Sequence, residues 1–444
     1  MQAFKHLLGQ IFSFLLLLVL ALVVTGWLLL DQEPLVARST QLNAASVQHG
    51  QQLMSSIHAS MQNEAASQLV IQTNADELNA AFAIAARTLP GFQGETQLKT
   101  DGLAVVMTMP WQVLGQRFFV NATIQIDAGQ GPLQLEQVQV GKVTLPGRFA
   151  LSLLSWVADQ AWGAGEGAKL LAKVRSITVH DNAVTVELDK PQGFGLASLK
   201  QQGVNMYRKL TGADSMKQDV EHYYQLAQEF SKTQPEGSLV VYLQLVFREA
   251  AKRTAESSDP ERAMLENRAA IYGLAQLFGG KNLQLLVNEV KHADEQASLK
   301  VTLGRRRDLQ QHFLYSATIH LLTSQNMSNT VGETKELLDS LSGGSGFSFV
   351  DLLADKAGVR FARLATDNLA QALALQAFFV AKERTEHEVF PSKARLAEGM
   401  PQQLFEQQYQ SIDSAVYQQM VAEIDRRLDA LPLYQLAKQA TPTP

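Results

Sequence analysis

Residues 118–126 have the alternation of a half-buried β-strand and read Phe118-Phe119-Val120-Asn121-Ala122-Thr123-Ile124-Gln125-Ile126. Every second residue of a strand lies on the same face, so this pattern predicts one apolar and one polar face. The alternation recurs in residues 133–140, and two more strands are expected at Thr96–Thr100 and Leu103–Met109, separated by the hairpin dipeptide Asp101-Gly102. These segments predict a sheet with one buried and one solvated face.

Helices and further strands border these sheet segments. A capping box at Thr73–Glu77 predicts a helix through about Arg87. The other expected elements are a strand at Leu69–Ile71, a helix from Phe149 to about Trp162 and a hairpin from Val174 to Leu188. We assign residues 67–192 to a small mixed β-sheet domain and residues 34–66 to a stalk helix that precedes it.

Beyond Ala213 the apolar residues recur with helical spacing to near the end of the chain. Asp259-Pro260-Glu261 combines an N-cap, a first-turn proline and a first-turn acid, and predicts the start of a helix that ends at Gly279-Gly280. Further helices are expected at Ser238–Glu256, Asp308–Leu322, Thr330–Leu341, Phe349–Ala381 and Pro401–Leu431. Their short connections predict an antiparallel helical domain over residues 214–436, with a linker at 193–213 and a disordered tail at 437–444.

The N-terminal segment Leu7–Leu30 contains 24 residues without a charge, enough to cross a hydrocarbon core of about 30 Å. Lys5 precedes it and Asp31 and Glu33 follow it, so the positive-inside rule predicts a cytoplasmic N-terminus. A cleaved signal peptide would have a shorter apolar region of about 7–15 residues. The sequence therefore predicts an uncleaved single-pass anchor, residues 1–33, in the inner (cytoplasmic) membrane, with the remaining body on the periplasmic or extracytoplasmic side.

The predicted fold class is thus α+β: one N-terminal transmembrane helix, a small mixed β-sheet domain and a larger C-terminal α-helical domain. The net charge of −5 gives no reason to expect a nucleic-acid partner. The chain has no cysteine, which excludes thiol nucleophiles, disulfides and thiolate zinc sites. The basic triplet Arg305–Arg307 is interpreted as a solvated turn.

One group of polar residues has the spacing of a site. His312 lies beside the apolar stripe of its expected helix and shares a face with Ser316. The expected carboxylate partners, each pair on one helix face, are Glu336 with Asp339 and Asp351 with Asp355. Such a cluster needs a cation, a shared proton or a histidine, because neighbouring carboxylates repel. We take these five residues as candidate catalytic or metal-ligating groups, whereas Glu333 is assigned to a capping box with Thr330.

The order of parts in residues 66–190 resembles the YpmS family of membrane-anchored envelope proteins. The residues that carry the resemblance are Ala75-Asp76-Glu77-Leu78-Asn79, the segment Val138–Pro146 that enters a helix, and the hairpin of Ile177–Val179 with Val184–Leu188. The resemblance implies the architecture and an envelope location. A second segment, about 308–360, is similar to the YfiM-like and VanZ-like families in His312-Phe313, Lys335-Glu336 with Asp339, Gly346-Phe347-Ser348, Asp351-Leu352, Asp355 and Gly358.

Two functions stay open. The first is a membrane-anchored cell-envelope protein that binds or scaffolds an envelope component, with a lipid or cell-wall compound as its ligand; the polar cluster would then fix helix register. The alternative is a metal-assisted hydrolase, in which His312 is a base or ligand and the four carboxylates are ligands or acid/base groups. The sequence contains no serine-nucleophile elbow, zinc-protease motif, phosphate loop or dinucleotide fingerprint. It leaves the cofactor, the metal and the oligomeric state undetermined.

Overall fold

The computed structural model divides into two compact units, Met1–Ser198 and Leu199–Pro444. It describes residues 24–37, 41–62, 67–89, 91–113, 115–131, 133–152, 155, 169, 171–180, 182–189, 216–259, 261–279, 299–322, 333, 335–336, 339–340 and 344–439. The predicted linker, residues 193–213, and most of the helix predicted from Phe149 lie outside these residues.

The predicted transmembrane helix is not supported. No helix of the described residues is both long and apolar enough to cross a membrane. Residues 7–23 of the expected span lie outside the described residues. The single-pass anchor and the inner-membrane location inferred from it are therefore corrected.

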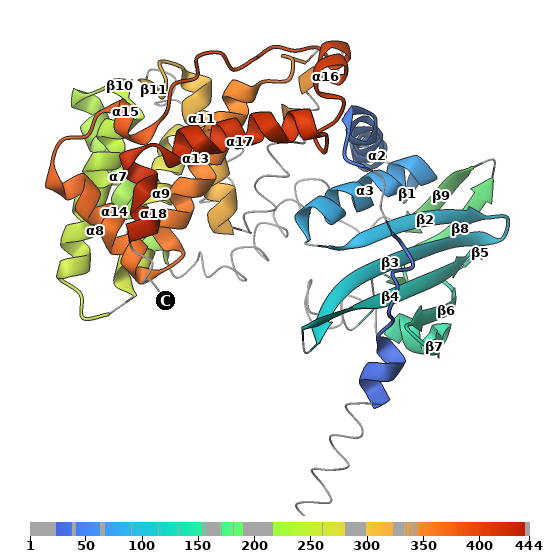
Figure 1. Cartoon of the computed structure of the whole chain (residues 1–444). Coiled ribbons are helices and arrows are strands. Elements are labelled where there is room, and N and C mark those ends of the chain that lie inside the picture. The colour runs from blue at the N-terminus through green and yellow to red at the C-terminus, as the bar shows by residue number, and fades with distance from the viewer. Residues whose placement is uncertain are drawn as a thin grey trace, which may run out of the picture. The chain divides into compact units, whose positions relative to one another are not determined.

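The first unit contains two sheets (Figure 1). The five-stranded sheet has the order β2 (Gln93–Lys99), β3 (Gly102–Val113), β4 (Gln116–Asp127), β6 (Leu135–Val140) and β7 (Val143–Pro146). The four-stranded sheet has the order β1 (Gln68–Asn74), β9 (Ala183–Asp189), β8 (Val174–His180) and β5 (Gly129–Gln130). Every described strand pair in these sheets is antiparallel, so the prediction of a mixed sheet is wrong.

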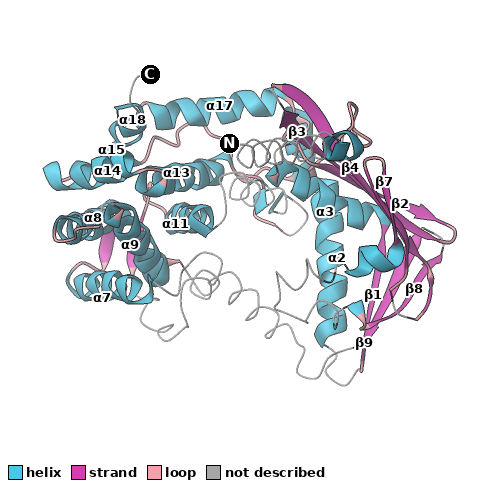
Figure 2. Ribbon diagram, turned by 90° about the horizontal axis from the view of Figure 1, so that it is seen from below, coloured by secondary structure: helices cyan, strands magenta, loops and turns pink. Residues whose placement is uncertain are grey.

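Alternating residues of these strands form the core of the first unit. Leu103, Ile177 and Val184 are buried together and join the two sheets. Gly102 begins β3 where an added Cβ atom would meet Ile126 O at 2.1 Å, so only glycine permits this approach. The helices α2 (Ala44–Gln62) and α3 (Ala75–Thr88) pack on each other and on β1, as Figure 2 shows. Asn74 caps α3 by accepting a hydrogen bond from Glu77 N.

The second unit is helical, as the sequence predicts. The helices named among its described residues are α7 (Lys217–Thr233), α8 (Leu239–Ala255), α9 (Arg262–Phe278), α11 (Arg307–Leu322), α13 (Phe349–Thr366), α14 (Leu369–Ala381), α15 (Glu386–Val389), α16 (Gln402–Tyr409), α17 (Ala415–Asp429) and α18 (Pro432–Gln439). A short parallel pair, β10 (Glu236–Ser238) and β11 (Lys300–Thr302), accompanies them. Helix α18 includes residues 437–439 of the predicted tail.

Two long predicted helices are each divided in the structure. The stretch predicted as one helix over Phe349–Ala381 breaks after Thr366, where Asn368 accepts a hydrogen bond from Gln371 N and caps α14. The stretch predicted over Pro401–Leu431 breaks at Gln410, which has a positive φ of 61°. Apolar spacing continues across both breaks, which is why periodicity alone did not reveal them.

Helices α11 and α13 pack closely along each other. Gly358 makes this approach possible, because a Cβ atom at this position would meet Phe313 O at 2.1 Å. Phe313 and Phe361 then contact across the interface, with ring centroids 5.4 Å apart. The close approach brings the polar residues near the start of α13 within reach of His312.

Candidate functional site

His312 and Asp355 meet across the interface of α11 and α13. His312 Nδ1 lies 3.0 Å from Asp355 Oδ1, and Ser316 Oγ, one turn further along α11, donates to the same oxygen at 2.8 Å. Because an ionised carboxylate only accepts hydrogen bonds, Nδ1 carries the hydrogen in this arrangement. The side chains of His312 and Asp355 are 11% and 6% exposed, so water screens this pair poorly.

Two more carboxylates, those of Asp351 and Glu336, lie at the start of α13. Ser348 caps the helix by accepting a hydrogen bond from Asp351 N at 3.0 Å. The Asp351 carboxylate contacts His312, with Oδ2 3.6 Å from His312 Nε2. Glu336 Oε2 accepts from Ser348 N at 3.0 Å and is fully buried. Capping and clustering therefore coexist at Asp351.

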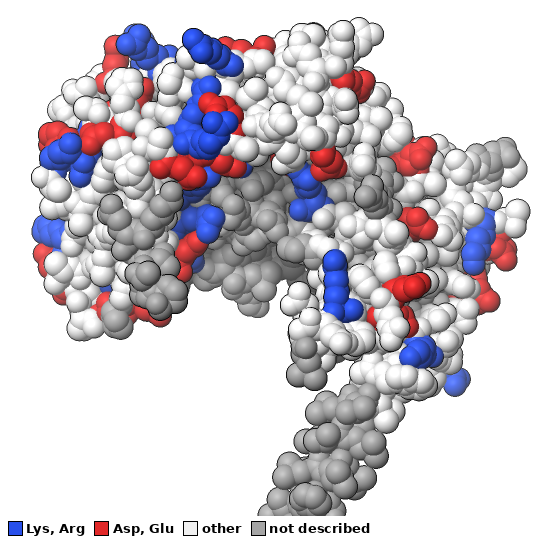
Figure 3. Space-filling view, in the orientation of Figure 1, with Lys and Arg blue, Asp and Glu red and all other residues white. Residues whose placement is uncertain are grey.

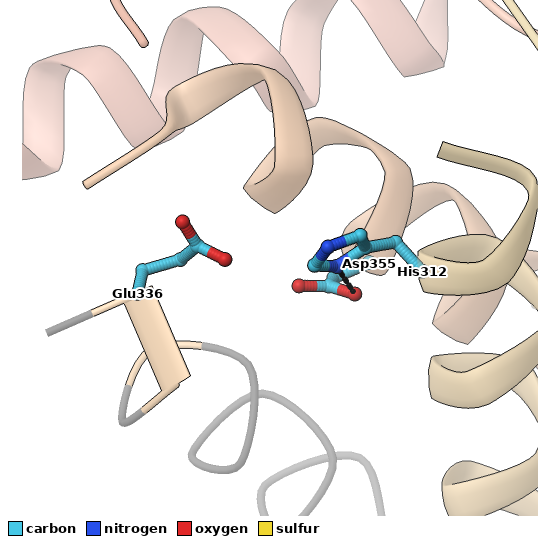
Figure 4. A group of neighbouring side chains, drawn as sticks. All are labelled: His312, Glu336 and Asp355. Atoms are coloured by element: carbon cyan, nitrogen blue, oxygen red, sulfur yellow. Dashed lines mark hydrogen bonds and ion pairs between the residues drawn. The ribbon is translucent and has the colours of Figure 1, made fainter. Parts of the chain in front are cut away.

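The structure brings three of the five predicted residues around one point. One nitrogen of His312 and one carboxylate oxygen each of Glu336 and Asp355 all lie within 4.8 Å of one another. Figure 4 shows Glu336 pointing toward the His312–Asp355 pair from the opposite side. Asp351 adjoins the cluster through His312, whereas Asp339 is joined to it only through Lys335, whose Nζ lies 2.6 Å from Asp339 Oδ2 and 3.2 Å from Glu336 Oε1.

One carboxylate oxygen of the cluster has no partner. Asp355 Oδ2 is buried and makes no hydrogen bond to any residue that the structure describes. In Figure 4 this oxygen, the one without the dashed line, points toward Glu336. An unsatisfied buried carboxylate oxygen is costly, because it has lost its water without gaining a donor. The position therefore favours a cation or another donor.

Burial and neighbouring charges shift the pKa values of the cluster. Burial disfavours the charged form of His312, but the charge and hydrogen bond of Asp355 and the charge of Asp351 outweigh it and raise its pKa to about 9. Burial raises the pKa of Glu336 to about 8, against the opposing charge of Lys335. Burial also raises the pKa of Asp351. These directions describe the cluster without a bound cation.

The network around the cluster has an excess of carboxylates. Arg306 contacts Asp308 and Glu398, and its Nη2 lies 3.5 Å from Asp351 Oδ1. Arg306 and Lys335 are the only permanent cations among the described residues that contact this network, and it holds six carboxylates, those of Asp308, Glu336, Asp339, Asp351, Asp355 and Glu398. The surface differs from this network, because basic and acidic side chains are interspersed on the face drawn in Figure 3.

Sequence reasoning missed several residues of this network. Arg306 was interpreted as part of a solvated turn, although Asp308, two residues later, signalled a local partner. Lys335 was quoted only within a motif, and Ser316 only for its shared face. Glu333, which was assigned to a cap, is buried, and its Oε1 accepts a hydrogen bond from Tyr417 Oη at 3.4 Å. Its predicted partner Thr330 lies outside the described residues.

A second buried carboxylate of this unit, Glu266, belongs to a separate network. Glu266 is fully buried, lies 2.8 Å from Arg253 Nε and 2.5 Å from Arg262 Nη2, and accepts a hydrogen bond from Tyr223 Oη at 2.6 Å. Burial and this hydrogen bond raise the pKa of Tyr223. All the partners of Glu266 come from α7, α8 and α9, so the network holds these helices together and leaves no oxygen for a ligand.

Comparisons with family models, with curated proteins and with solved structures found no match to this chain. The resemblances to the YpmS, YfiM-like and VanZ-like families therefore stay predictions.

Proposed function

We propose that the second unit binds one divalent metal ion between His312, Glu336 and Asp355, and that the ion assists a hydrolytic reaction. The observation that carries metal binding is Asp355 Oδ2, a buried carboxylate oxygen that faces Glu336 and has no described hydrogen-bond partner. A cation there would satisfy this oxygen and offset the excess of carboxylates.

The donor set favours a first-row transition metal. Imidazole suits zinc and iron, and carboxylates suit manganese and magnesium, so one imidazole with two carboxylates is best matched by Zn²⁺ or Mn²⁺. Ca²⁺ takes about six to eight oxygen ligands and is a poorer match. With metal–ligand bonds of about 2.1 Å, two ligands lie at most about 4.2 Å apart, so the separation of up to 4.8 Å must shrink by roughly 0.6 Å on binding.

Three protein ligands leave coordination positions for water or substrate, as in catalytic zinc sites. A metal ion bound there would lower the pKa of a coordinated water and so provide a nucleophile near neutral pH. The contribution of the chain is orientation. Asp355 Oδ1 accepts the Nδ1 hydrogen of His312, which fixes the tautomer, so Nε2, which lies 3.6 Å from Asp351 Oδ2, is the nitrogen that would act as a ligand. The same pairing of histidine and carboxylate is common in metal sites.

A structural network is the second candidate, and one observation favours it. Glu336 accepts the Ser348 N–H and contacts Lys335, so it holds the start of α13 without any ion. In that case the cluster fixes helix register, and the chain functions as a binding or scaffolding protein.

Metal content distinguishes the two candidates. The purified full chain, equilibrated with Zn²⁺ or Mn²⁺ and dialysed, should retain one equivalent of metal by elemental analysis. Asp355→Asn should lose it, and Asp367→Asn, a control at the end of α13 outside the cluster, should keep it. Equal retention by both variants, or none by the unaltered chain, would refute the metal site.

Turnover tests the hydrolytic part separately. The metal-loaded chain should hydrolyse chromogenic carboxylic or phosphoric esters faster than the chelated chain or Asp355→Asn. A stably loaded chain with no activity above that of Asp355→Asn on either ester class would overturn the hydrolytic assignment and leave the metal site standing.

A further inference from the structure

The first unit contains a segment, residues 24–37, that contacts β3, β4 and the turn between β6 and β7; we name it the strap. Asp31 exchanges two backbone hydrogen bonds of 2.8 Å with Phe119 on β4. Lys142 N donates to Leu28 O at 2.7 Å, and Lys142 Nζ donates to Trp27 O at 2.8 Å. These contacts fix the C-terminal end of the helix at residues 24–29 to the sheet.

Buried Asn121 is the centre of the attachment. Its Nδ2 donates to Asp31 Oδ2 and to Glu33 O, both at 2.9 Å. Its Oδ1 accepts from Leu35 N at 3.0 Å and from Thr108 Oγ1 at 2.7 Å. Three of these four hydrogen bonds hold the strap in place, and the fourth joins Asn121 to Thr108 on β3.

Between the strap and the sheet lies an open cavity of about 1020 Å³. This volume is at the upper end of the range for small-molecule sites, about 300–1,000 Å³. Its apolar lining consists of Trp27, Leu30, Leu35, Val113 and Phe118. The Trp27 and Leu35 side chains remain 65% and 60% exposed, so the strap does not cover its own apolar surface.

Charged groups of both signs lie in the same lining. Lys142 stacks over the Trp27 ring, with Nζ 4.0 Å from the ring centroid, and has no ion pair with any described residue. Asp31 and Glu33 are lining carboxylates that likewise form no ion pair among the described residues. An apolar wall beside one unpaired ammonium group and two unpaired carboxylates is complementary to an apolar chain with a head group of both charges.

We propose that this cavity binds a single-chain zwitterionic amphiphile. The acyl chain lies against Trp27, Leu35 and Phe118. The anionic phosphate of the head group pairs with Lys142, and its ammonium group pairs with Asp31 and Glu33. This site is independent of the metal site, because every residue that it uses belongs to the first unit.

The probe for the test is a lysophosphatidylcholine with bromine atoms in its acyl chain, used below its micelle concentration with the full chain. Bromine quenches nearby tryptophan, and all four tryptophans of the chain, at positions 27, 111, 156 and 162, lie in the first unit. We expect saturable quenching, and Trp27→Phe should remove most of it.

Two exposed positions provide matched variants that are not expected to affect folding. Leu35→Glu places a charge in the cavity and should weaken binding by about tenfold or more, because a leucine side chain loses its burial against the acyl chain. Met54→Glu, on α2 outside the cavity lining and 64% exposed, should bind like the unaltered chain. Equal affinities of the two variants would overturn the proposal. Equal affinities are also the result expected if the probe binds to the charge-free segment before the strap and not in the cavity.

Head-group charge is tested with probes of the same chain length. An alkyl sulfonate and an alkyltrimethylammonium should each compete at least about tenfold less well than the zwitterion, since each leaves one sign of lining charge unpaired. Lys142→Gln should reduce this preference over the ammonium probe. Equal competition by all three probes would refute the head-group assignment.

Discussion

Replacing Glu336 by glutamine in the metal-free chain should remove part of the decrease in stability that occurs as pH rises. Glu336 is fully buried, and burial raises its pKa from 4.5 to about 8. Between pH 4.5 and pH 8, the folded chain therefore holds a proton on this carboxyl group that the unfolded chain has lost. The contribution of this group to stability falls as pH rises from 4.5 toward 8.

The size of the effect follows from these two pKa values. Between pH 6 and pH 9 the linkage relation gives a loss of roughly 2 to 3 kcal/mol in the free energy of unfolding for Glu336 alone. Glutamine does not titrate, so Glu336→Gln should gain about that amount relative to the unaltered chain over this range. His312, with a pKa raised from 6.5 to about 9, also loses stability over this range and stays in both proteins.

The assay is urea denaturation in chelator at several pH values between 6 and 9, followed by far-ultraviolet circular dichroism. Tryptophan fluorescence would report only the first unit, because all four tryptophans lie there. A matched control is Asp367→Asn at the end of α13, which should leave the difference between pH 6 and pH 9 close to that of the unaltered chain. Parallel curves for Glu336→Gln and the unaltered chain would refute the reasoning, since Glu336 would then be ionised over the whole range.

Three further predictions test the surroundings of the site. Gly358→Ala should lower the free energy of unfolding by about 1 to 3 kcal/mol and abolish metal retention, because the new Cβ atom would meet Phe313 O and separate α11 from α13. A normal melting temperature with full metal retention would contradict this prediction. Glu266→Gln should cost about 1 to 3 kcal/mol in urea denaturation, because the half-buried Arg253 and Arg262 keep Asp219 but lose their buried carboxylate partner. A loss below about 1 kcal/mol would show that the network contributes little. Glu388 has a pKa lowered to about 2, mainly by a backbone N–H at the start of α15, so its stabilisation is present above pH 4.5 and lost as pH falls toward 2. The melting temperature of Glu388→Gln should therefore depend less on pH in this acid range than that of the unaltered chain. Identical acid profiles of the two proteins would count against the cap.

Much of the fold could be predicted from local pattern. The alternation in β4 and β6 and the hairpin dipeptide before β3 predicted four strands of the five-stranded sheet, and the cap before α3 predicted that helix close to its true start. Both signals are local, because strand and helix periods place a buried face without reference to the rest of the chain. The break between α13 and α14 was missed although Asn368 is an ordinary N-cap residue, because the apolar pattern runs through it.

The site was predictable only in part, for a related reason. Spacing correctly placed His312 beside Ser316, and Asp351 one turn before Asp355, on single helix faces. Which helices meet depends on packing, and the only hint in the sequence was Gly358, where two backbones could approach. Arg306 belongs to the same network through contacts at long sequence separation, which no local pattern encodes.

The central claim is that His312, Glu336 and Asp355 ligate one metal ion, and metal-edge X-ray absorption of the zinc-loaded full chain tests it most directly. The account predicts a first shell of nitrogen and oxygen at about 2.0–2.2 Å with the outer scattering of one imidazole, and loss of that imidazole signal in His312→Ala. A spectrum without imidazole scattering, or one that is unchanged in His312→Ala, would contradict it.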